Sequence, residues 1–101
     1  MREQGYEILA RNLETPVGEC DILAEHDDRL IFVEVKTRGS SRYGPPELAV
    51  HREKRDQLRR VAKFELRERE HKNCQFDVIA IEFDMDEPEL RHIKSAFGGV
   101  E

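Results

Sequence analysis

The sequence predicts an α/β fold, a single domain with a mixed β-sheet and one long helix. Two alternating segments, 18–26 and 29–37, meet at the two-residue turn Asp27-Asp28, which is typical of a β-hairpin. A further apolar segment, 74–83, follows a long charged segment with helical spacing. A strand, a helix and a strand in this order favour a parallel pair joined by a right-handed crossover.

The remaining elements have their own signals. Residues 5–12 predict a first strand that ends at Asn12, which completes an antiparallel three-strand meander with the hairpin. A Gly/Ser/Pro-rich loop covers 38–46, and the helix is expected from Pro46, where proline suits the first turn, to about Lys72. The fourth strand is expected to lie parallel to the third, and 89–97 is a short strand or an irregular segment.

Composition sets limits on the class of protein. The chain has 101 residues, of which 39% are charged and 38% hydrophobic, so it can build one modest core with a well-solvated surface. No apolar run approaches the ~18 residues of a membrane helix, and no leader with an apolar segment is present, so a cytoplasmic protein without a membrane partner is expected. Cys20 and Cys74 have no CxxC partner, which favours two ordinary thiols over a zinc site.

Charge is unevenly distributed along the chain. The net charge is -5, which argues mildly against a nucleic-acid partner. The segment from Lys36 to Lys63, however, contains nine Lys/Arg against three acids. A basic middle on an acidic body is a plausible footprint for a polyanion, and the alternative is a helix with an ordinary solvated face.

Charged residues gather at one end of the predicted hairpin. With the turn at Asp27-Asp28, Asp21 lies opposite Glu34, and Glu19 lies opposite Lys36. Side chains alternate between the faces of a strand, so one face is wholly apolar. It carries Cys20, Ile22, Ala24, Ile31, Val33 and Val35. The other face carries Leu23, Leu30 and Phe32 near the turn, and then Asp21, Glu34, Glu19 and Lys36.

Two facing carboxylates with β-carbons ~5 Å apart repel each other, so this polar cluster needs an explanation. Water at an exposed strand end, an ion pair of Glu19 or Glu34 with Lys36, or a divalent cation would each provide one. Mg²⁺ favours one or two carboxylates together with water and phosphate oxygens. It lowers the pKa of a bound water and shields charge on a phosphate, and Lys36 could hold the attacking water on the same face.

The predicted helix carries a basic stripe. Arg52, Arg55, Arg59 and Lys63 fall within an arc of about 80° on a helical wheel, roughly opposite Val50, Leu58 and Val61. The stripe is therefore expected to face solvent, where it could contact phosphates without reading base sequence. An ordinary solvated face is the alternative.

Two isolated residues leave open questions. Lys54 lies close to the apolar arc of the helix, so it either snorkels past that arc or reaches toward the polar cluster from behind. Asp77 lies in the middle of a strand and is expected to bind a backbone amide or an arginine rather than to join the polar cluster.

The arrangement of Asp21 and Glu34-Val35-Lys36 resembles the signature of the PD-(D/E)XK nuclease superfamily. The words "GYEILARN", "GECDILA", "LIFVEVKTR", "YGPPELAV" and "HIKSAF" resemble the run of motifs in the YraN-like family, over residues 5–97. That family is bacterial and is described as predicted endonucleases related to archaeal Holliday-junction resolvases.

The resemblance implies a restriction-endonuclease-like fold and a metal-dependent endonuclease acting on branched or structured DNA. Asp21 and Glu34 would ligate Mg²⁺ or Mn²⁺ with the Val35 carbonyl as third ligand, Lys36 would position the water and stabilise the transition state, and Glu19 would lie at the rim. The expected nucleic-acid contacts are Arg38, Arg52, Arg55, Arg59 and Lys63. The alternatives are a non-catalytic nucleic-acid-binding module and a structural partner of a DNA-processing complex.

Members of that family usually begin with a helix that carries a Gly-Glu pair upstream of the Gly-Tyr word. Here Gly5-Tyr6 is preceded only by "MREQ", so the sequence predicts a single nuclease-like domain over residues 1–101 without this helix and its glutamate. The sheet surface that such a helix covers, and the first strand as an edge, favour a homodimer.

Overall fold

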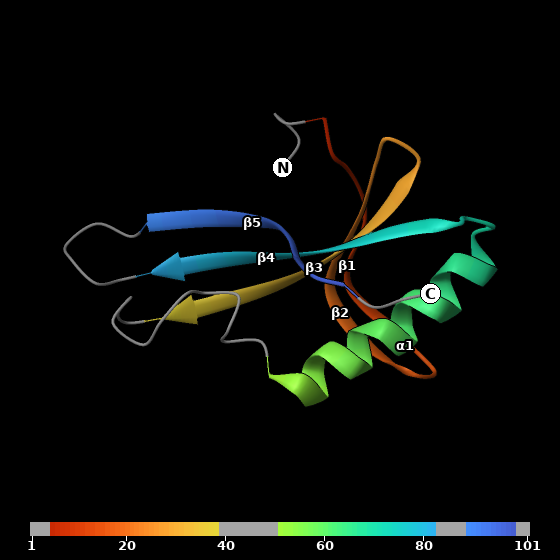
Figure 1. Ribbon diagram of the computed structural model, residues 1–101, viewed down its shortest axis with the longest axis horizontal. Coiled ribbons are helices and arrows are strands. Elements are labelled where there is room, and N and C mark those ends of the chain that lie inside the picture. Colours follow the sequence, from red (N-terminus) through yellow and green to blue (C-terminus); the bar gives the residue numbers. More distant parts are fainter. Residues whose placement is uncertain (1–4, 39–50, 83–88, 99–101) are drawn as a thin grey trace.

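The structure is a computed structural model that describes residues 5–38, 51–82 and 89–98. It contains one helix and a five-stranded sheet, which Figure 1 shows with the helix lying along one side of the strands. The elements are β1 (Glu7–Thr15), β2 (Gly18–His26), β3 (Arg29–Arg38), α1 (Arg52–Glu68), β4 (Asn73–Glu82) and β5 (Glu89–Phe97).

The strands lie in the order β1-β2-β3-β4-β5, so β1 and β5 are the two edges of the sheet. The β3–β4 pair is parallel, and the other neighbours are antiparallel. This confirms the predicted three-strand meander, the crossover helix and the parallel fourth strand. The sequence predicted either a short strand or an irregular segment for 89–97, and the structure shows that it is the fifth strand.

The hairpin has the predicted register. Its paired residues run from Ile22 with Val33 to His26 with Arg29. Asp27 and Asp28 both adopt left-handed backbone conformations, with φ of 50° and 62°. A two-residue turn with this geometry matches the twist of the strands, and aspartate tolerates it better than most residues.

Several predicted boundaries were wrong. The first strand runs from Glu7 to Thr15 rather than from residue 5 to Asn12, because its pairing with β2 continues past Asn12, even though Asn12 takes a left-handed φ of 51°. The helix begins at Arg52, since His51 is an extended N-cap residue, and it ends at Glu68 rather than near Lys72. Arg38 belongs to β3 rather than to the predicted loop, and the other loop positions, Pro46 among them, lie outside the described residues.

The sheet has an apolar cluster on each face. The α1 face holds Leu23, Phe32, Leu58 and Phe76 among others, while Tyr6, Ala24, Ile31, Val33 and Ile79 form the cluster on the opposite face, called here the Tyr6 face. One assignment was wrong: Cys20 belongs to the α1 cluster and not with Ile22. The β2–β3 pairing ends at Ile22, and Asn12, with its left-handed φ of 51°, lies between the β1 partners of Ile22 and Cys20, so the backbone is irregular where the alternation fails.

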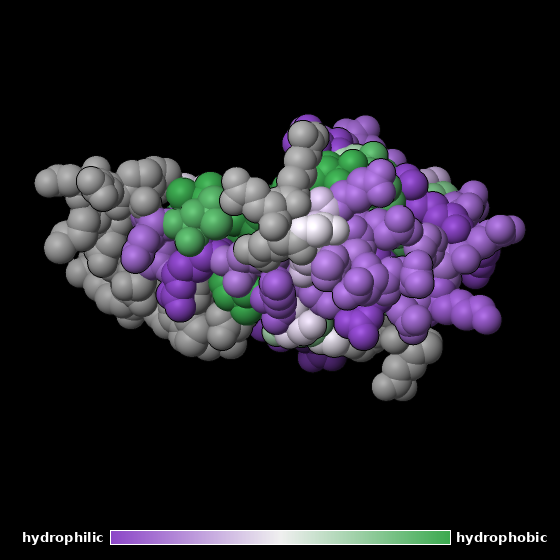
Figure 2. All heavy atoms as spheres, turned by 90° about the horizontal axis from the view of Figure 1, so that it is seen from above, coloured by the Kyte–Doolittle hydropathy of each residue, from purple (hydrophilic) through white to green (hydrophobic). Residues whose placement is uncertain are grey.

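The surface is mostly polar, as the composition predicts. Hydrophilic residues cover most of the coloured surface in Figure 2, and hydrophobic residues are confined to small areas. Among the described residues, the large hydrophobic side chains that are clearly exposed are Val17 and Leu90. No helix in this part of the chain combines the length and the apolar character needed to cross a membrane.

Candidate metal and nucleic-acid site

Asp21 and Glu34 meet on the α1 face, immediately beyond the last paired residues of the hairpin. Asp21 Oδ2 accepts a hydrogen bond of 2.8 Å from the backbone amide of Val35. The two carboxyl groups also share a hydrogen bond. Glu34 is only 4% exposed, so the exposed-end explanation for this carboxylate is excluded. The structure therefore brings together the two carboxylates that the sequence placed opposite each other.

One oxygen of Glu34 is poorly satisfied. Oε2 is buried and accepts no hydrogen bond within the described residues. Lys54 Nζ lies 3.5 Å from it, which is an ion-pair distance but not a well-formed hydrogen bond. A buried carboxylate oxygen without a donor is costly for a structure to hold, and it is a natural ligand atom for a cation.

The environment shifts the pKa values of the two carboxyl groups in opposite directions. Burial, a hydrogen bond to Asp21 and the charge of Asp21 raise the pKa of Glu34 to about 7, although Lys54 and Lys36 oppose this shift. Burial alone would raise the pKa of Asp21 as well. It is nevertheless lowered, because Glu34 and the Val35 amide donate hydrogen bonds to Asp21, and Lys54 and Lys36 supply positive charge. Glu34 therefore keeps its proton into the mildly acidic range and releases it as the pH rises through about 7.

The remaining predicted site residues lie near this pair. Glu19 and Asp21 both line a cavity of about 180 Å³ beside β1 and β2, so Glu19 lies close to the pair. Its side chain is exposed, and within the sheet it pairs with Glu14 of β1. Lys36 is partly buried in β3, close enough to lower the pKa of both carboxylates.

The donor set fits a hard divalent cation only in part. The two carboxylates are oxygen ligands of the type that Mg²⁺ and Mn²⁺ prefer. Within residues 5–38, 51–82 and 89–98, no group of three or more acidic, His or Cys side chains forms a metal cage. The orphaned Glu34 Oε2 is the feature that favours a cation beside Asp21.

Two residues of α1 complete the surroundings of the pair. Lys54 Nζ donates hydrogen bonds to Gln57 Oε1 at 2.8 Å and to the Glu19 carbonyl at 3.4 Å. Lys54 thus reaches toward the polar cluster, which settles the alternative left open by the sequence. Gln57 was missed, and its signal is Gly18: a Cβ there would lie 2.5 Å from Gln57 Cγ, so only glycine lets α1 approach β2 this closely.

The basic stripe of α1 only partly faces solvent, contrary to expectation. The Arg52 side chain is 92% exposed and Lys63 is exposed. Arg55 and Arg59 are instead partly buried, with their guanidinium groups 5.8 Å and 5.6 Å from the ring centre of Phe97 in β5. The sequence could not foresee this, because it left the β5 segment unassigned.

Arg59 has two further partners, and Arg38 is described only in part. Arg59 binds Asp56 at 2.7 Å and donates to the Gly98 carbonyl at 2.9 Å. Arg38 is the last residue of β3, and its side chain lies outside the described part of the chain. Arg52 and Lys63 are therefore the stripe residues best exposed to a phosphate backbone.

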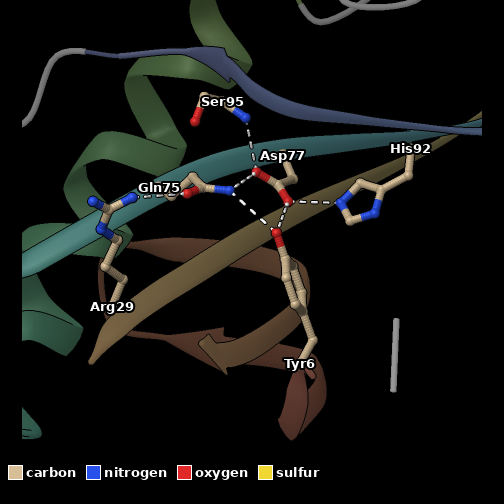
Figure 3. Close-up of polar contacts among 6 residues, drawn as sticks. All are labelled: Tyr6, Arg29, Gln75, Asp77, His92 and Ser95. Atoms are coloured by element: carbon tan, nitrogen blue, oxygen red, sulfur yellow. Dashed lines mark hydrogen bonds and ion pairs between the residues drawn. The ribbon is translucent and has the colours of Figure 1, made fainter. Parts of the chain in front are cut away.

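A second polar cluster lies on the Tyr6 face, around the fully buried Asp77 (Figure 3). Asp77 Oδ1 accepts hydrogen bonds from Gln75 Nε2 at 2.8 Å and from the Ser95 amide at 3.0 Å. Asp77 Oδ2 accepts one from Tyr6 Oη at 3.2 Å and lies 2.6 Å from His92 Nε2. The sequence correctly predicted a backbone amide as partner, while Tyr6 and His92 were missed.

This cluster fixes the end of β5. Ser95 has a left-handed φ of 51°, and the β4–β5 register shifts between Phe76 and Val78. The irregularity places Phe97 in a stacked position on Phe76, with ring centres 4.9 Å apart. Arg55 and Arg59 of α1 pack over Phe97, so Asp77 indirectly supports the helix that carries Lys54.

Comparison with known proteins gives consistent matches over most of the chain. A family model described as "Uncharacterised protein family UPF0102" matches residues 1–81. A UPF0102 protein of Syntrophotalea carbinolica is 48% identical over 99 residues, covering 96% of this chain and 80% of the relative. A UPF0102 protein of Syntrophomonas wolfei is 41% identical, with 96% and 86% covered. A UPF0102 protein of Geobacter metallireducens is 45% identical over 94 residues, with 91% and 77% covered.

Proposed function

Since the chain belongs to the uncharacterised protein family UPF0102, the YraN-like family that its motifs resemble, we propose that it is a metal-dependent endonuclease of the restriction-endonuclease-like, PD-(D/E)XK type. Its substrate is branched or structured DNA in the cytoplasm, and the reaction is hydrolysis of a phosphodiester bond. One observation carries the proposal: the orphaned Glu34 Oε2 lies next to Asp21 on a sheet that also carries Lys36.

Three groups would hold Mg²⁺ or Mn²⁺, namely the carboxylates of Asp21 and Glu34 and the backbone carbonyl of Val35. The bound cation would supply an activated water and positive charge for the phosphate. The chain itself holds these ligands in place. The Val35 amide orients the Asp21 carboxylate at 2.8 Å, and burial keeps Glu34 from turning into solvent.

Lys36 is the proposed catalytic cation. It follows Glu34 by two positions in β3, so it projects from the same face of the sheet. Its ammonium group would orient the attacking water and neutralise the charge that develops on the phosphate. Interactions that strengthen in the transition state raise the rate of the chemical step more than they raise substrate affinity.

DNA affinity would come from the basic residues around this site. Arg52 and Lys63 are exposed on α1, and Arg38 ends the strand that carries Glu34 and Lys36. Phosphate contacts of this kind provide affinity without sequence readout. Arg55 and Arg59 would contribute from positions that also pack on Phe97.

A homodimer would suit a branched substrate. A four-way junction presents two scissile strands related by approximate two-fold symmetry, and one compact site cannot cut both at once. The edge strand β1 offers backbone groups through which two copies could pair. Analytical ultracentrifugation with and without a four-way junction tests this assembly, and a monomer that cuts both strands symmetrically would contradict it.

Cleavage assays test the activity. A labelled four-way junction and a matched linear duplex are incubated with the protein and Mg²⁺ or Mn²⁺, and Asp21→Asn and Lys36→Ala proteins purified in the same way are the controls. We expect cut junction with the native protein, no cutting by either variant, and nearly unchanged junction binding by Lys36→Ala. Cutting by both variants would identify a contaminant. Metal-independent binding without cutting would favour the alternative of a non-catalytic nucleic-acid-binding module.

A further inference from the structure

A positive charge already reaches the carboxylate pair from the helix. Lys54 extends from α1 toward Glu34 of β3, and its Nζ lies 3.5 Å from Glu34 Oε2. The Glu34 side chain is 6% exposed and the Lys54 side chain 30% exposed. An ion pair with one partner this deeply buried is weakly screened by salt, so the two groups interact more strongly than an exposed surface pair.

The Lys54 ammonium is held in this place by other groups. It donates to Gln57 Oε1 and to the Glu19 carbonyl, so its hydrogen-bonding capacity is directed at the site. Gln57 in turn lies close to Gly18, where a Cβ would be 2.5 Å from Gln57 Cγ. Lys54 also precedes Lys36 among the charges that lower the pKa of Asp21 and of Glu34. Of these two lysines, Lys54 therefore has the stronger electrostatic effect on the two carboxylates.

A divalent cation would need the same oxygen. Among the described residues, Glu34 Oε2 accepts no hydrogen bond, so it is a ligand atom available to a metal, and Lys54 Nζ lies 3.5 Å from it. Two cations so close together repel strongly in a partly buried site. Lysine has a flexible stem, and its partial exposure gives the ammonium a route into solvent.

We propose that Lys54 is a built-in counter-ion of the Asp21–Glu34 pair, which a divalent cation must displace in order to bind. This inference rests on the metal-dependent function proposed above. It assigns to Lys54 a role distinct from that of Lys36: Lys54 neutralises the pair before the metal arrives, and it thereby weakens metal binding.

Calorimetric titration with Mn²⁺ alone tests the proposal on the full chain. Lys54→Met removes the charge while keeping an unbranched stem and helix propensity, and Lys54→Gln is a second neutral variant in case one perturbs the fold. The matched control is Lys36→Met, which removes the same charge from the same face. We expect both Lys54 variants to bind Mn²⁺ about tenfold more tightly than the native protein. Lys36→Met should tighten binding less than either Lys54 variant, because Lys54 Nζ lies at ion-pair distance from Glu34 Oε2 and Lys54 acts more strongly than Lys36 on both carboxylates.

A direct readout of the ammonium complements the affinities. The Lys54 side-chain nitrogen signal is followed by NMR during a titration with Mg²⁺, and Lys63, which is exposed on the same helix, is the internal control. Displacement should shift the Lys54 signal in parallel with metal binding and leave the Lys63 signal in place. Adding Asp21→Asn to Lys54→Met should remove the gain in Mn²⁺ affinity.

The outcomes separate this proposal from the proposed function. Binding that depends on Asp21 in the native protein, but that gains no more from Lys54→Met than from Lys36→Met, would overturn the role of Lys54 and leave the metal site intact. If no variant, including Lys54→Met, shows Mn²⁺ binding that depends on Asp21, the metal-dependent function itself fails, and the counter-ion role fails with it.

Discussion

The Asp21 carboxylate accepts a hydrogen bond from the Val35 amide at 2.8 Å, which ties β2 to β3 just beyond their last paired residues. This contact orients Asp21 toward Glu34. It makes asparagine the informative substitution, because the amide oxygen of Asn can still accept from Val35 while the negative charge is lost.

We therefore expect Asp21→Asn to lower the pKa of Glu34 from about 7, because it removes the negative charge and the shared proton. The pKa should stay above the ordinary value of 4.5, since Glu34 remains buried. NMR titration of the Glu34 carboxyl carbon measures this change. An equal pKa of Glu34 in both proteins would mean that burial alone raises it and that Asp21 has no effect on it.

The raised pKa of Glu34 should also make the free energy of unfolding depend on pH. This pKa is 4.5 when unperturbed and about 7 in the folded state, so between these values the folded protein holds a proton that the unfolded chain releases. Stability from this group is therefore full below pH 4.5 and falls as the pH rises to about 7. The loss is on the order of 3 kcal/mol at most.

Urea unfolding at several pH values measures this dependence. Glu34→Gln cannot titrate, so its free energy of unfolding should fall less between mildly acidic and neutral pH than that of the native protein. Glu7→Gln, on an exposed residue of β1, is the control and should keep the native slope. Parallel slopes for Glu34→Gln and the native protein would contradict the raised pKa.

The sequence predicted the hairpin and the carboxylate pair well, for a physical reason. The register of a two-residue hairpin is set locally by the turn, so Asp27-Asp28 was enough to place Asp21 near Glu34. Alternation then put Lys36 on the same face. These inferences needed no knowledge of how distant parts of the chain pack.

The parts that were missed depend on packing between distant segments. The positions of Arg55 and Arg59 follow from Phe97, which reaches α1 through the irregular end of β5. The partners of Asp77 come from β1 and β5, and no local spacing connects them. The end of the first strand was predicted wrongly, because β1 continues past Asn12 to Thr15 although Asn12 takes a left-handed conformation.

Gly18 should be intolerant of a side chain. Its φ is +149°, and a Cβ would lie 2.5 Å from Gln57 Cγ and 3.1 Å from Val61 Cγ2. We expect Gly18→Ala to lower the free energy of unfolding by about 1–3 kcal/mol, because α1 must move away from β2. Gly98→Ala is the matched control, since nothing lies within 4 Å of its Cβ position. Urea unfolding that gives equal values for both variants would contradict the close approach.

Asp77 should be among the most sensitive positions of the Tyr6 face. Asp77→Ala leaves Tyr6, Gln75, His92 and the Ser95 amide without their shared acceptor, which should cost on the order of 3–5 kcal/mol. Asp77→Asn keeps one acceptor oxygen and should cost clearly less. Denaturant unfolding compares the two variants. Similar small losses for both would show that the buried network contributes little to stability.

DNA binding should distinguish the exposed basic residues from those that pack on Phe97. If Arg52 and Lys63 contact phosphates, changing both to alanine should weaken binding to every sequence alike. It should also flatten the dependence of log affinity on log salt by about 0.9 per lost contact. Both residues are exposed, so the fold should be unaffected. Fluorescence anisotropy on one duplex and one junction over a range of salt concentrations measures the slope.

The matched control removes two exposed cations from elsewhere, with Arg11→Ala and Lys94→Ala combined. This pair changes the net charge equally. Lys94 lies over the Tyr6 ring and thus on the side away from α1, so the control should keep the native salt slope. Arg59→Ala should instead lower stability, because Arg59 binds Asp56 and the Gly98 carbonyl. Equal slopes for the native protein and the Arg52/Lys63 variant would make that face of α1 an ordinary solvated surface, and DNA would have to bind through other residues.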